Sequence, residues 1–320
     1  MAIPIRKFGQ YVLIEVHTED RKLIFSTDSL KVDFDIRHTE GWSRAKFSIT
    51  NLAPDTVKKI SNEGHFATVT VALHDAEPIV IADRMFISNA LEEKKVPSAV
   101  TNLYCYSKLR RAYLEEQIDI KVVSPSIRKV IETCIKESGY TGVIEFKHFP
   151  EGLLDNLPPK PASRRQGSLL SVLESYSYEQ RLKVFTVGNK FIIIYQPTAK
   201  NVTGTDFYTS EGDILLSTTN MRSNPKIGPA TLKVHSNLDP RIIPTSILNI
   251  SQLLTVGTDT SQVALEVAEN ILKDSVAGFT KYQTLSVQHK GSNWTSEWST
   301  HVGATSPTVG INMNTDKWWI

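Results

Sequence analysis

Histidine is the residue type in this sequence best suited to acid–base or metal chemistry, and its eight copies are dispersed along the chain. No two lie four residues apart, the spacing that places two imidazoles on one helix face to bind a metal ion. His289 and His301 form the nearest candidate pair, which Asp239 or Glu297 would have to complete. Isolated histidines are more often surface or turn residues than ligands. We therefore predict no metal site and no cofactor.

Two pairs of adjacent glutamates, Glu92-Glu93 and Glu115-Glu116, offer the carboxylates that glycoside hydrolysis requires. Charged runs of this kind are usually solvated strand ends or turns. The specific motifs of enzymes are absent from the sequence, which has no GxGxxG, no Walker-type glycine loop, no GxSxG elbow and no HExxH. We therefore predict no catalytic residues and a protein that is not an enzyme, with a cell-wall hydrolase as the last alternative.

Four tryptophans lie late in the sequence: Trp294, Trp298, Trp318 and Trp319. Large aromatic side chains outside a core mark contacts with partners or with carbohydrate. One of Trp294 and Trp298 can lie in the core while the other contacts a partner, and a structural role for both is an equal alternative. Chain ends fray unless something holds them, so we expect the apolar tail 318–320 to dock on a neighbouring subunit or on its own chain. A carbohydrate-binding or adhesion module is the second hypothesis.

The composition is that of a folded protein with room for two or three domains, since the chain has 320 residues, of which 40% are hydrophobic and 22% charged. The formal net charge is +2 and the basic runs are only pairs, which gives no support for a nucleic-acid binder. Cys105 and Cys134 are too few for a disulfide framework, and we expect buried thiols. No segment has the length and hydrophobicity of a signal peptide or a membrane span.

The first hundred residues are predicted to be antiparallel strands because apolar residues alternate with period two over 32–36, 45–49 and 67–73. Short strands separated by Gly, Asn, Asp and Pro favour a sandwich or a small barrel. One or two helical turns are expected at 54–60, where Pro54 suits the first helical position.

The middle of the chain predicts helices. Ser124-Pro125 is expected to cap and start a helix that Gly139 ends, and its apolar residues recur at i, i+3, i+4, i+7 and i+8: Ile127, Val130, Ile131, Cys134 and Ile135. A second helix is expected from Ser168, followed by a hairpin whose strands are 182–186 and 191–195. These segments indicate a small α/β domain.

Strand patterning returns after residue 200, with a third helix expected at 261–272 and a strand at 281–289. The predicted order is β, then α/β, then β. We therefore predict a mainly β protein of α+β character, with domains at 1–107, 108–200 and 201–320.

The sequence resembles the hub family of phage tails and contractile injection systems, which includes late-control-type and baseplate hub proteins. The similarity rests on the order of four weak motifs across nearly the whole chain. They are Arg44 to Leu52 with Pro54-Asp55-Thr56 and Ile60, the two central helix units that each lead into a strand, Leu232 to Pro244, and Tyr282 to His289 with Gly291 and Trp298-Ser299-Thr300. Where hub proteins usually have Pro-Gly, this chain has Pro244-Thr245, so we expect a different turn there.

The resemblance implies two β-barrel-like hub domains that flank the α/β domain, in a homotrimer whose six barrels form a ring. Such a ring joins the sixfold tail tube to a threefold central spike, contacts wedge or tape-measure proteins, and passes DNA through its lumen without specific binding. It implies a virion location at the tail tip or baseplate, after synthesis in the host bacterial cytoplasm, and no membrane partner. The interface candidates are Asn51, Leu52, Asn237, Pro240, Pro244, Trp294, Trp298, Trp318 and Trp319.

Overall fold

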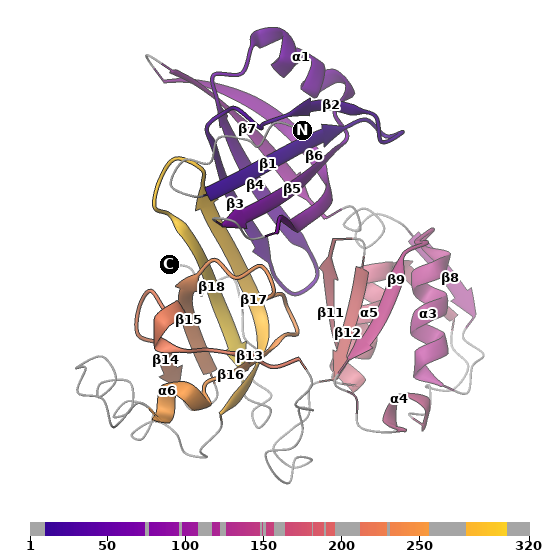
Figure 1. The fold of residues 1–320 in the computed structure, drawn as a ribbon. Helices are drawn as coiled ribbons and strands as arrows, with labels where there is room; N and C mark the ends of the chain where they lie inside the picture. Colours follow the sequence, from indigo (N-terminus) through magenta and orange to yellow (C-terminus); the bar gives the residue numbers. More distant parts are fainter. Residues whose placement is uncertain are drawn as a thin grey trace.

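A computed structural model gives the fold in three parts, an N-terminal β unit, a central α/β unit and a C-terminal β unit (Figure 1). The mainly β fold class with a small α/β part in the middle is confirmed. The structure describes residues 10–73, 77–95, 98–107, 117–121, 126–147, 149, 152–156, 164–180, 182–188, 190–195, 212–228, 231–255 and 280–305.

The N-terminal β unit is a set of antiparallel strands that curls around one core. The strands are β1 (Gln10–His17), β2 (Leu23–Ser26), β3 (Val32–His38), β4 (Ser43–Thr50), β5 (Phe66–Leu73), β6 (Ile79–Lys95) and β7 (Ser98–Tyr106). Every second residue of β1, β3 and β4 is buried, as the predicted alternation requires. Phe34, Phe47, Val69 and Leu103 from four strands meet in one hydrophobic cluster, which is how a sheet that closes towards a barrel forms its core.

Helix α1 (Pro54–Glu63) follows β4 and is longer than predicted. Pro54 lies in the first turn, as predicted, because its missing N–H is not needed there. Ile60 is the fully buried side chain of this helix and Val57 packs beside it, so these two apolar residues fix the helix to the strands.

The α/β unit holds the predicted helices and hairpin. Its elements are β8 (Gln117–Lys121), α3 (Ile127–Glu137), β9 (Val143–Lys147), α4 (Leu153–Asn156), β10 (Arg164–Ser168), α5 (Leu169–Gln180), β11 (Leu182–Val187) and β12 (Lys190–Tyr195). The hairpin of β11 and β12 is extended by β9, which runs parallel to β12. Strands β8 and β10 form a separate antiparallel pair.

Helix α3 confirms the predicted amphipathic pattern, because all five predicted apolar residues are buried in the core of the α/β unit. Its N-cap is Ser126, whose side chain accepts a hydrogen bond from the Lys129 amide at 3.5 Å. The predicted cap Ser124-Pro125 lies outside the described residues. Gly139 has a φ of +77°, the left-handed conformation expected after a helix end.

The C-terminal β unit contains β13 (Ile214–Leu215), a 3-10 turn (Thr218–Asn220), β14 (Lys226–Gly228), β15 (Thr231–Asn237), β16 (Ile247–Asn249), α6 (Ser251–Thr255), β17 (Lys281–Ser292) and β18 (Trp298–Thr305). Strand β17 confirms and extends the predicted strand 281–289. The predicted helix at 261–272 lies outside the described residues. Leu232, Val234, Val287 and Val302 bring β15, β17 and β18 into one core.

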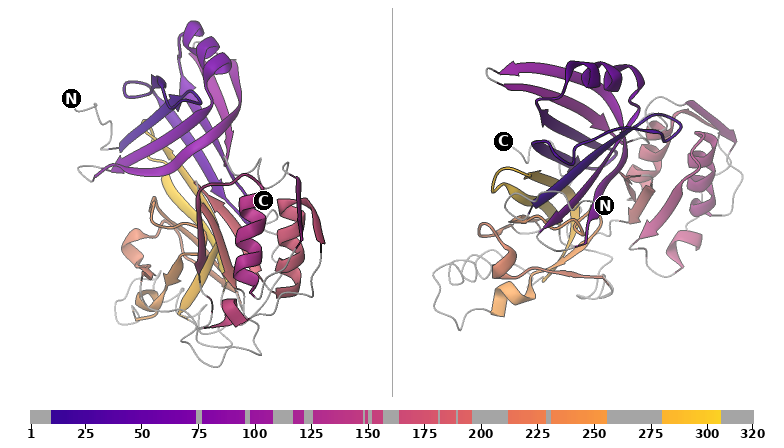
Figure 2. Two further views of the ribbon diagram at one scale, coloured as in Figure 1. Left: turned by 90° about the vertical axis from the view of Figure 1, so that its right-hand side faces the viewer. Right: turned by 45° about the horizontal axis from the view of Figure 1, so that its top comes forward.

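The two β units share one continuous sheet, which no local sequence pattern predicts. One edge of β17 pairs with β18 along most of its length. The other edge pairs first with β16, over residues 281–283, and then with β3, over residues 287–292. Figures 1 and 2 show β17 running from the C-terminal unit into the N-terminal unit, with the α/β unit to one side.

Thr245 has a positive φ, a backbone conformation that glycine adopts far more readily than threonine. Its φ is +79°, although the side chain is a buried, β-branched threonine, and such residues are strained at positive φ. The Thr245 amide donates to the Thr284 carbonyl at 2.8 Å, and the Thr284 amide donates to the Ser246 carbonyl at 2.8 Å. These bonds hold the strained residue against β17. Replacing glycine by threonine at position 245 was expected to change the turn, but Thr245 does not adopt the negative φ usual for threonine.

Candidate functional site

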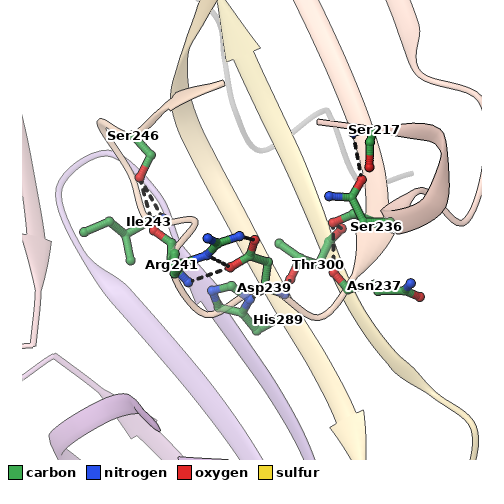
Figure 3. Close-up of polar contacts among 10 residues, drawn as sticks. Ser217, Ser236, Asn237, Asp239, Arg241, Ile243, Ser246, His289 and Thr300 are labelled. Atoms are coloured by element: carbon green, nitrogen blue, oxygen red, sulfur yellow. Dashed lines mark hydrogen bonds and ion pairs between the residues drawn. The ribbon is translucent and has the colours of Figure 1, made fainter. Parts of the chain in front are cut away.

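The site that unites the three units lies where β3, β17 and β11 approach one another. On the C-terminal side, the loop 238–246 is fastened to β17 and β18 by a chain of hydrogen bonds (Figure 3). The Asp239 amide donates to Thr300 Oγ1 at 3.0 Å, and Thr300 Oγ1 lies 3.0 Å from His289 Nδ1. His289 Nε2 lies 3.1 Å from the Ile242 carbonyl oxygen. Because a carbonyl can only accept, Nε2 carries the proton and Nδ1 accepts from Thr300.

The same loop is stiffened by the carboxylate of Asp239. It receives two hydrogen bonds from the Arg241 guanidinium, at 2.9 and 2.7 Å, and a third from the Arg241 amide at 3.0 Å (Figure 3). Burial alone would raise the pKa of Asp239, but these bonds from Arg241 outweigh it and hold the pKa below its ordinary value. Pro240, between the two partners, and the buried Pro244 restrict the backbone further.

On the other side of the site, the turn between β3 and β4 reaches into the α/β unit. The Ser43 hydroxyl donates to the Thr186 carbonyl at 2.6 Å and lies 2.7 Å from His38 Nδ1. Since Ser43 has one proton and gives it to Thr186, His38 Nδ1 must donate to Ser43. Thr186 Oγ1 returns a bond to the Gly41 carbonyl at 3.0 Å.

Two further contacts hold the α/β unit in place. The Lys183 ammonium pairs with the Glu40 carboxylate at 2.6 Å, and the Gly41 amide donates to the Val184 carbonyl at 2.9 Å. Beside them a small hydrophobic cluster joins Leu285 of β17 to three residues of the β11–β12 hairpin: Phe185, Ile192 and Ile194. The junction thus combines one small apolar cluster with several side-chain hydrogen bonds.

His38 and His289 face each other across the β3–β17 pair, with ring centroids 6.1 Å apart. Burial and, to a smaller extent, the neighbouring His289 together lower the pKa of His38 to about 3. Burial also lowers the pKa of His289 to about 4, against the opposing effect of its bond to the Ile242 carbonyl. Both rings are therefore neutral near pH 7, and they serve as hydrogen-bonding parts of the junction.

The structure separates the histidines considered as a metal pair. His289 pairs across the strands with Thr300, whereas His301 pairs with Gln288, so the two side chains project from opposite faces of the sheet. His301 instead stacks on His235 of β15, with centroids 4.1 Å apart. Among the described residues, no three His, Cys, Asp or Glu side chains are grouped so that they could hold a metal ion. No described helix is long and apolar enough to cross a bilayer.

The predicted interface residues near the strands have contacts within the chain. Asn51 has a φ of +59° and accepts a hydrogen bond from the Ala99 amide at 3.1 Å, which ties the end of β4 to β7. Leu52 is buried in the N-terminal core. Asn237 is exposed and accepts from Arg222 Nε at 3.1 Å.

The late tryptophans have different surroundings. Trp298 is buried and packs edge to face on Phe34, at 5.7 Å between centroids, so it belongs to the core. Trp294 is 43% exposed. Trp318 and Trp319 lie outside the described residues. Cys105 and Cys134 are buried free thiols, as predicted, and burial raises the pKa of Cys105.

Sequence reasoning missed His38, Ser43, Thr186 and Lys183 as junction residues. Their types are ordinary in strands, and their contacts join residues 143 positions apart. One local signal existed, because His38 ends the buried face of β3 and Lys183 interrupts the apolar strand β11 at a buried position, and buried polar groups need partners.

Comparison with known proteins gives a match in structure and none in sequence. No protein-family model matches the chain, and no curated protein matches it in sequence. A tail protein from Neisseria meningitidis MC58 has a similar structure, with a TM-score of 0.52 and 10% identity over 93% of this chain and 97% of that one. The 43 kDa tail protein of prophage MuSo2 from Shewanella oneidensis gives a TM-score of 0.52 and 6% identity over 93% and 98%.

A chain of the lidded Francisella PdpA–VgrG complex is also similar, with a TM-score of 0.51 and 8% identity. The match covers 94% of this chain and 54% of that chain. At these identities the similarity shows a shared fold. It extends over all three units of the chain.

Proposed function

We propose that this protein is the structural hub at the tip of a phage tail or a related injection machine. The observation that carries the proposal is the likeness to two tail proteins over nearly their whole lengths. The hub would be a homotrimeric ring that adapts the sixfold tail tube to a threefold spike and forms part of the channel for genome delivery. Its partners would be the tube protein, the central spike and wedge or tape-measure proteins, and it would pass DNA without specific binding.

The arrangement of the β units supports this proposal. Each unit has its own hydrophobic core, and β17 fixes one unit to the other by pairing with β3. A ring of three subunits would contain six β units, two from each subunit. The pairing of β17 with β3 would hold the two β units of each subunit at a constant orientation in such a ring. The sheet order ends at β14 and at β2. A closed ring can cover such strand edges, which otherwise promote aggregation.

The test is the mass of the purified full chain, measured by light scattering over a range of concentrations. The proposal predicts a species of three times 35.8 kDa. A monomer at every concentration would contradict a self-assembling trimer. The location that follows from the proposal is the virion, at the tail tip or baseplate, after synthesis in the host cytoplasm.

A carbohydrate-binding or adhesion module is the second candidate, because Trp294 is 43% exposed and exposed tryptophan is a common sugar contact. This candidate predicts that host-surface polysaccharide quenches tryptophan fluorescence in the wild type and fails to do so in Trp294→Ala. Unchanged fluorescence in the wild type would reject it. A cell-wall hydrolase is the last candidate, and a peptidoglycan digestion assay separates it from the other two.

A further inference from the structure

One side of the continuous sheet carries a cluster of basic residues that we call the basic face. It consists of Arg37, Arg44, Lys46, Lys226, Lys233 and Lys290, from five strands of both β units. On β3, β4 and β15 the side chains alternate between the core and the outside, whereas β17 between them is buried at most positions and its Lys290 is half-buried. In β4, for example, Arg44 and Lys46 are exposed while Ala45 and Phe47 are buried. Lys226 and Lys233 are exposed in the same way at the far end of the sheet.

The strand register places these residues beside one another. Arg44 lies opposite Arg37, and Arg37 lies opposite Gln288. Gln288 is followed by His301 on β18 and His235 on β15. A parallel row runs from Tyr104 through Lys46 and Asp35 to Lys290. With strands about 4.8 Å apart, the seven strands from β7 to β14 span roughly 30 Å.

The basic face places like charges opposite each other on neighbouring strands. Arg37 lies directly opposite Arg44, and Lys226 lies directly opposite Lys233. Like charges in directly opposite positions destabilise a sheet. Neutral polar residues at these outward positions would keep the alternation and avoid the repulsion. The Asp35 carboxylate offsets part of this repulsion by pairing with Arg37 at 3.0 Å, and a partner that brings negative charge would offset more of it.

The N-terminal end of the basic face is hollowed and aromatic. A groove of about 410 Å³ runs beside Arg37, Arg44 and Lys46, and its walls include Trp42, Tyr104 and Tyr106. The Lys46 ammonium lies 5.5 Å from the centre of the Tyr104 ring. Arginine, tyrosine and tryptophan are the residues that contribute most to the affinity of protein interfaces.

We propose that the basic face, with its aromatic groove, binds an acidic surface or segment of a partner protein. Charge complementarity identifies the partner as acidic, and the groove composition favours a protein. Asp33 and Asp35 lie within the face. A nucleic acid carries a phosphate at every nucleotide, so the carboxylates of Asp33 and Asp35 would repel part of its backbone. A partner protein can place its carboxylates opposite the lysines and arginines and leave neutral residues opposite the aspartates.

Asp35 is a permanent charge of this face. Burial would raise its pKa, but hydrogen bonds from Arg37, at 3.0 and 3.2 Å, and from Gln288, at 2.7 Å, hold the pKa below its ordinary value. On the same face, burial, the neighbouring His235 and the positive charges of Lys290 and Arg222 together lower the pKa of His301 to about 4, against the opposing effect of Asp35. The histidines thus stay neutral, and the charge pattern of the face is set by arginine, lysine and aspartate.

The test uses the full chain and labelled poly-L-glutamate as an acidic probe, with binding followed by fluorescence anisotropy at low and physiological ionic strength. The charge reversal Arg44→Glu/Lys46→Glu changes the face at exposed positions. The matched control Lys58→Glu/Lys59→Glu makes the same change of net charge at exposed positions on α1. We expect the first variant to weaken binding by about tenfold or more and the control by less than about twofold. The neutralising variant Lys226→Gln/Lys233→Gln tests the far end and is expected to weaken binding too.

Circular dichroism checks that each variant folds, and should the charge reversal not fold, the Lys226→Gln/Lys233→Gln variant decides. Equal losses in a face variant and in the α1 control would overturn the proposal, since net charge alone would then explain binding. Absence of binding by the wild type would overturn it as well. A single-stranded oligonucleotide with the same number of charges is the probe for the alternative, a nucleic-acid partner. If it bound about tenfold more tightly than poly-L-glutamate and lost affinity in the same variants, the proposal of a protein partner would be wrong and the face would be a nucleic-acid surface. The proposal does not require a trimer. Light scattering tests the trimer and fluorescence anisotropy tests the basic face, so failure of one proposal can be distinguished from failure of the other.

Discussion

The two junctions of the molecule are built differently. The N-terminal and C-terminal β units are joined by the β3–β17 pairing, which runs from Val287 opposite His38 to Ser292 opposite Asp33. The α/β unit is joined mainly by side-chain hydrogen bonds, one ion pair and a small hydrophobic cluster, with one isolated β-bridge between Glu40 and Phe185. Extended backbone pairing survives most side-chain changes, whereas a junction made mostly of side chains depends on each of them. The two β units therefore form one body, to which the α/β unit is attached less firmly.

Acidification is expected to have the largest effect, because it acts on the histidines of the β3–β17 junction. His38 and His289 have pKa values of about 3 and about 4 in the folded chain, against about 6.5 in an unfolded one. Below pH 6.5 the unfolded chain binds protons that the folded chain does not, so stability is lost as the pH falls. We expect the free energy of unfolding to drop by roughly 5 kcal/mol between pH 7 and pH 4.

Urea unfolding at a series of pH values measures this effect. The variant His289→Gln is expected to be less stable at pH 7 and to lose part of the pH dependence, since His38 and the half-buried His301, with a pKa of about 4, still titrate. Equal unfolding free energies of the wild type at pH 7 and pH 4.5 would show that the rings are not buried as described. Ordinary carboxylates titrate mainly below this range.

The next largest effect is expected at Gly291, where β17 passes between two aromatic rings. A Cβ atom there would lie 2.5 Å from Phe34 and 2.7 Å from Trp298. Gly291→Ala should therefore destabilise the chain by about 3 kcal/mol, the upper range for overpacking a core. Thermal unfolding measures the change. Phe34→Leu in the same chain shortens the clashing ring and should restore part of the loss; an additive second loss would argue against the clash.

A smaller and more local effect is expected from Ser43→Ala at the junction with the α/β unit. The substitution leaves the Thr186 carbonyl and His38 Nδ1 without their partner, at a cost of about 2 kcal/mol. Amide hydrogen exchange should become faster in β11 and stay slow in the β3–β17 pairing. Ser48→Ala, which removes a hydrogen bond to Asn102 away from the junction, is the control. Equal acceleration in both places would mean that the two junctions open together.

The smallest effect is a gain in stability. Thr245→Gly removes a β-branched residue from a φ of +79° and is expected to raise the free energy of unfolding by about 1 kcal/mol. The comparison is Thr231→Gly in β15, an ordinary strand position, where glycine should cost about 1 kcal/mol. A loss in both variants would mean that the Thr245 conformation carries no strain.

The elements with local periodicity were predictable from the sequence. The spacing of the five apolar residues of α3 and the alternation in β3, β4 and β5 indicate which face of each element is buried. This pattern is local, so a short stretch of sequence is enough to predict it. The hairpin of β11 and β12 was predicted for the same reason. The N-cap at Ser126 instead of Ser124-Pro125 shows how a helix start depends on a few backbone angles that a pattern does not fix.

The junctions were not predictable, because their partners are far apart in the sequence. Val287 pairs with His38 across 249 positions, and no local pattern specifies such a register. The basic face was missed for a related reason. Short basic runs such as Arg164-Arg165 suggest no cluster, yet the register places Arg37, Arg44 and Lys46 side by side. A near-neutral net charge says nothing about charge on one face.

The most direct test of the account is negative-stain imaging of the purified full chain. The account predicts rings of three subunits with a central hole and six similar lobes, two from each subunit, with the α/β units attached to the ring. Compact single particles of monomer size, with no ring at any concentration, would contradict it.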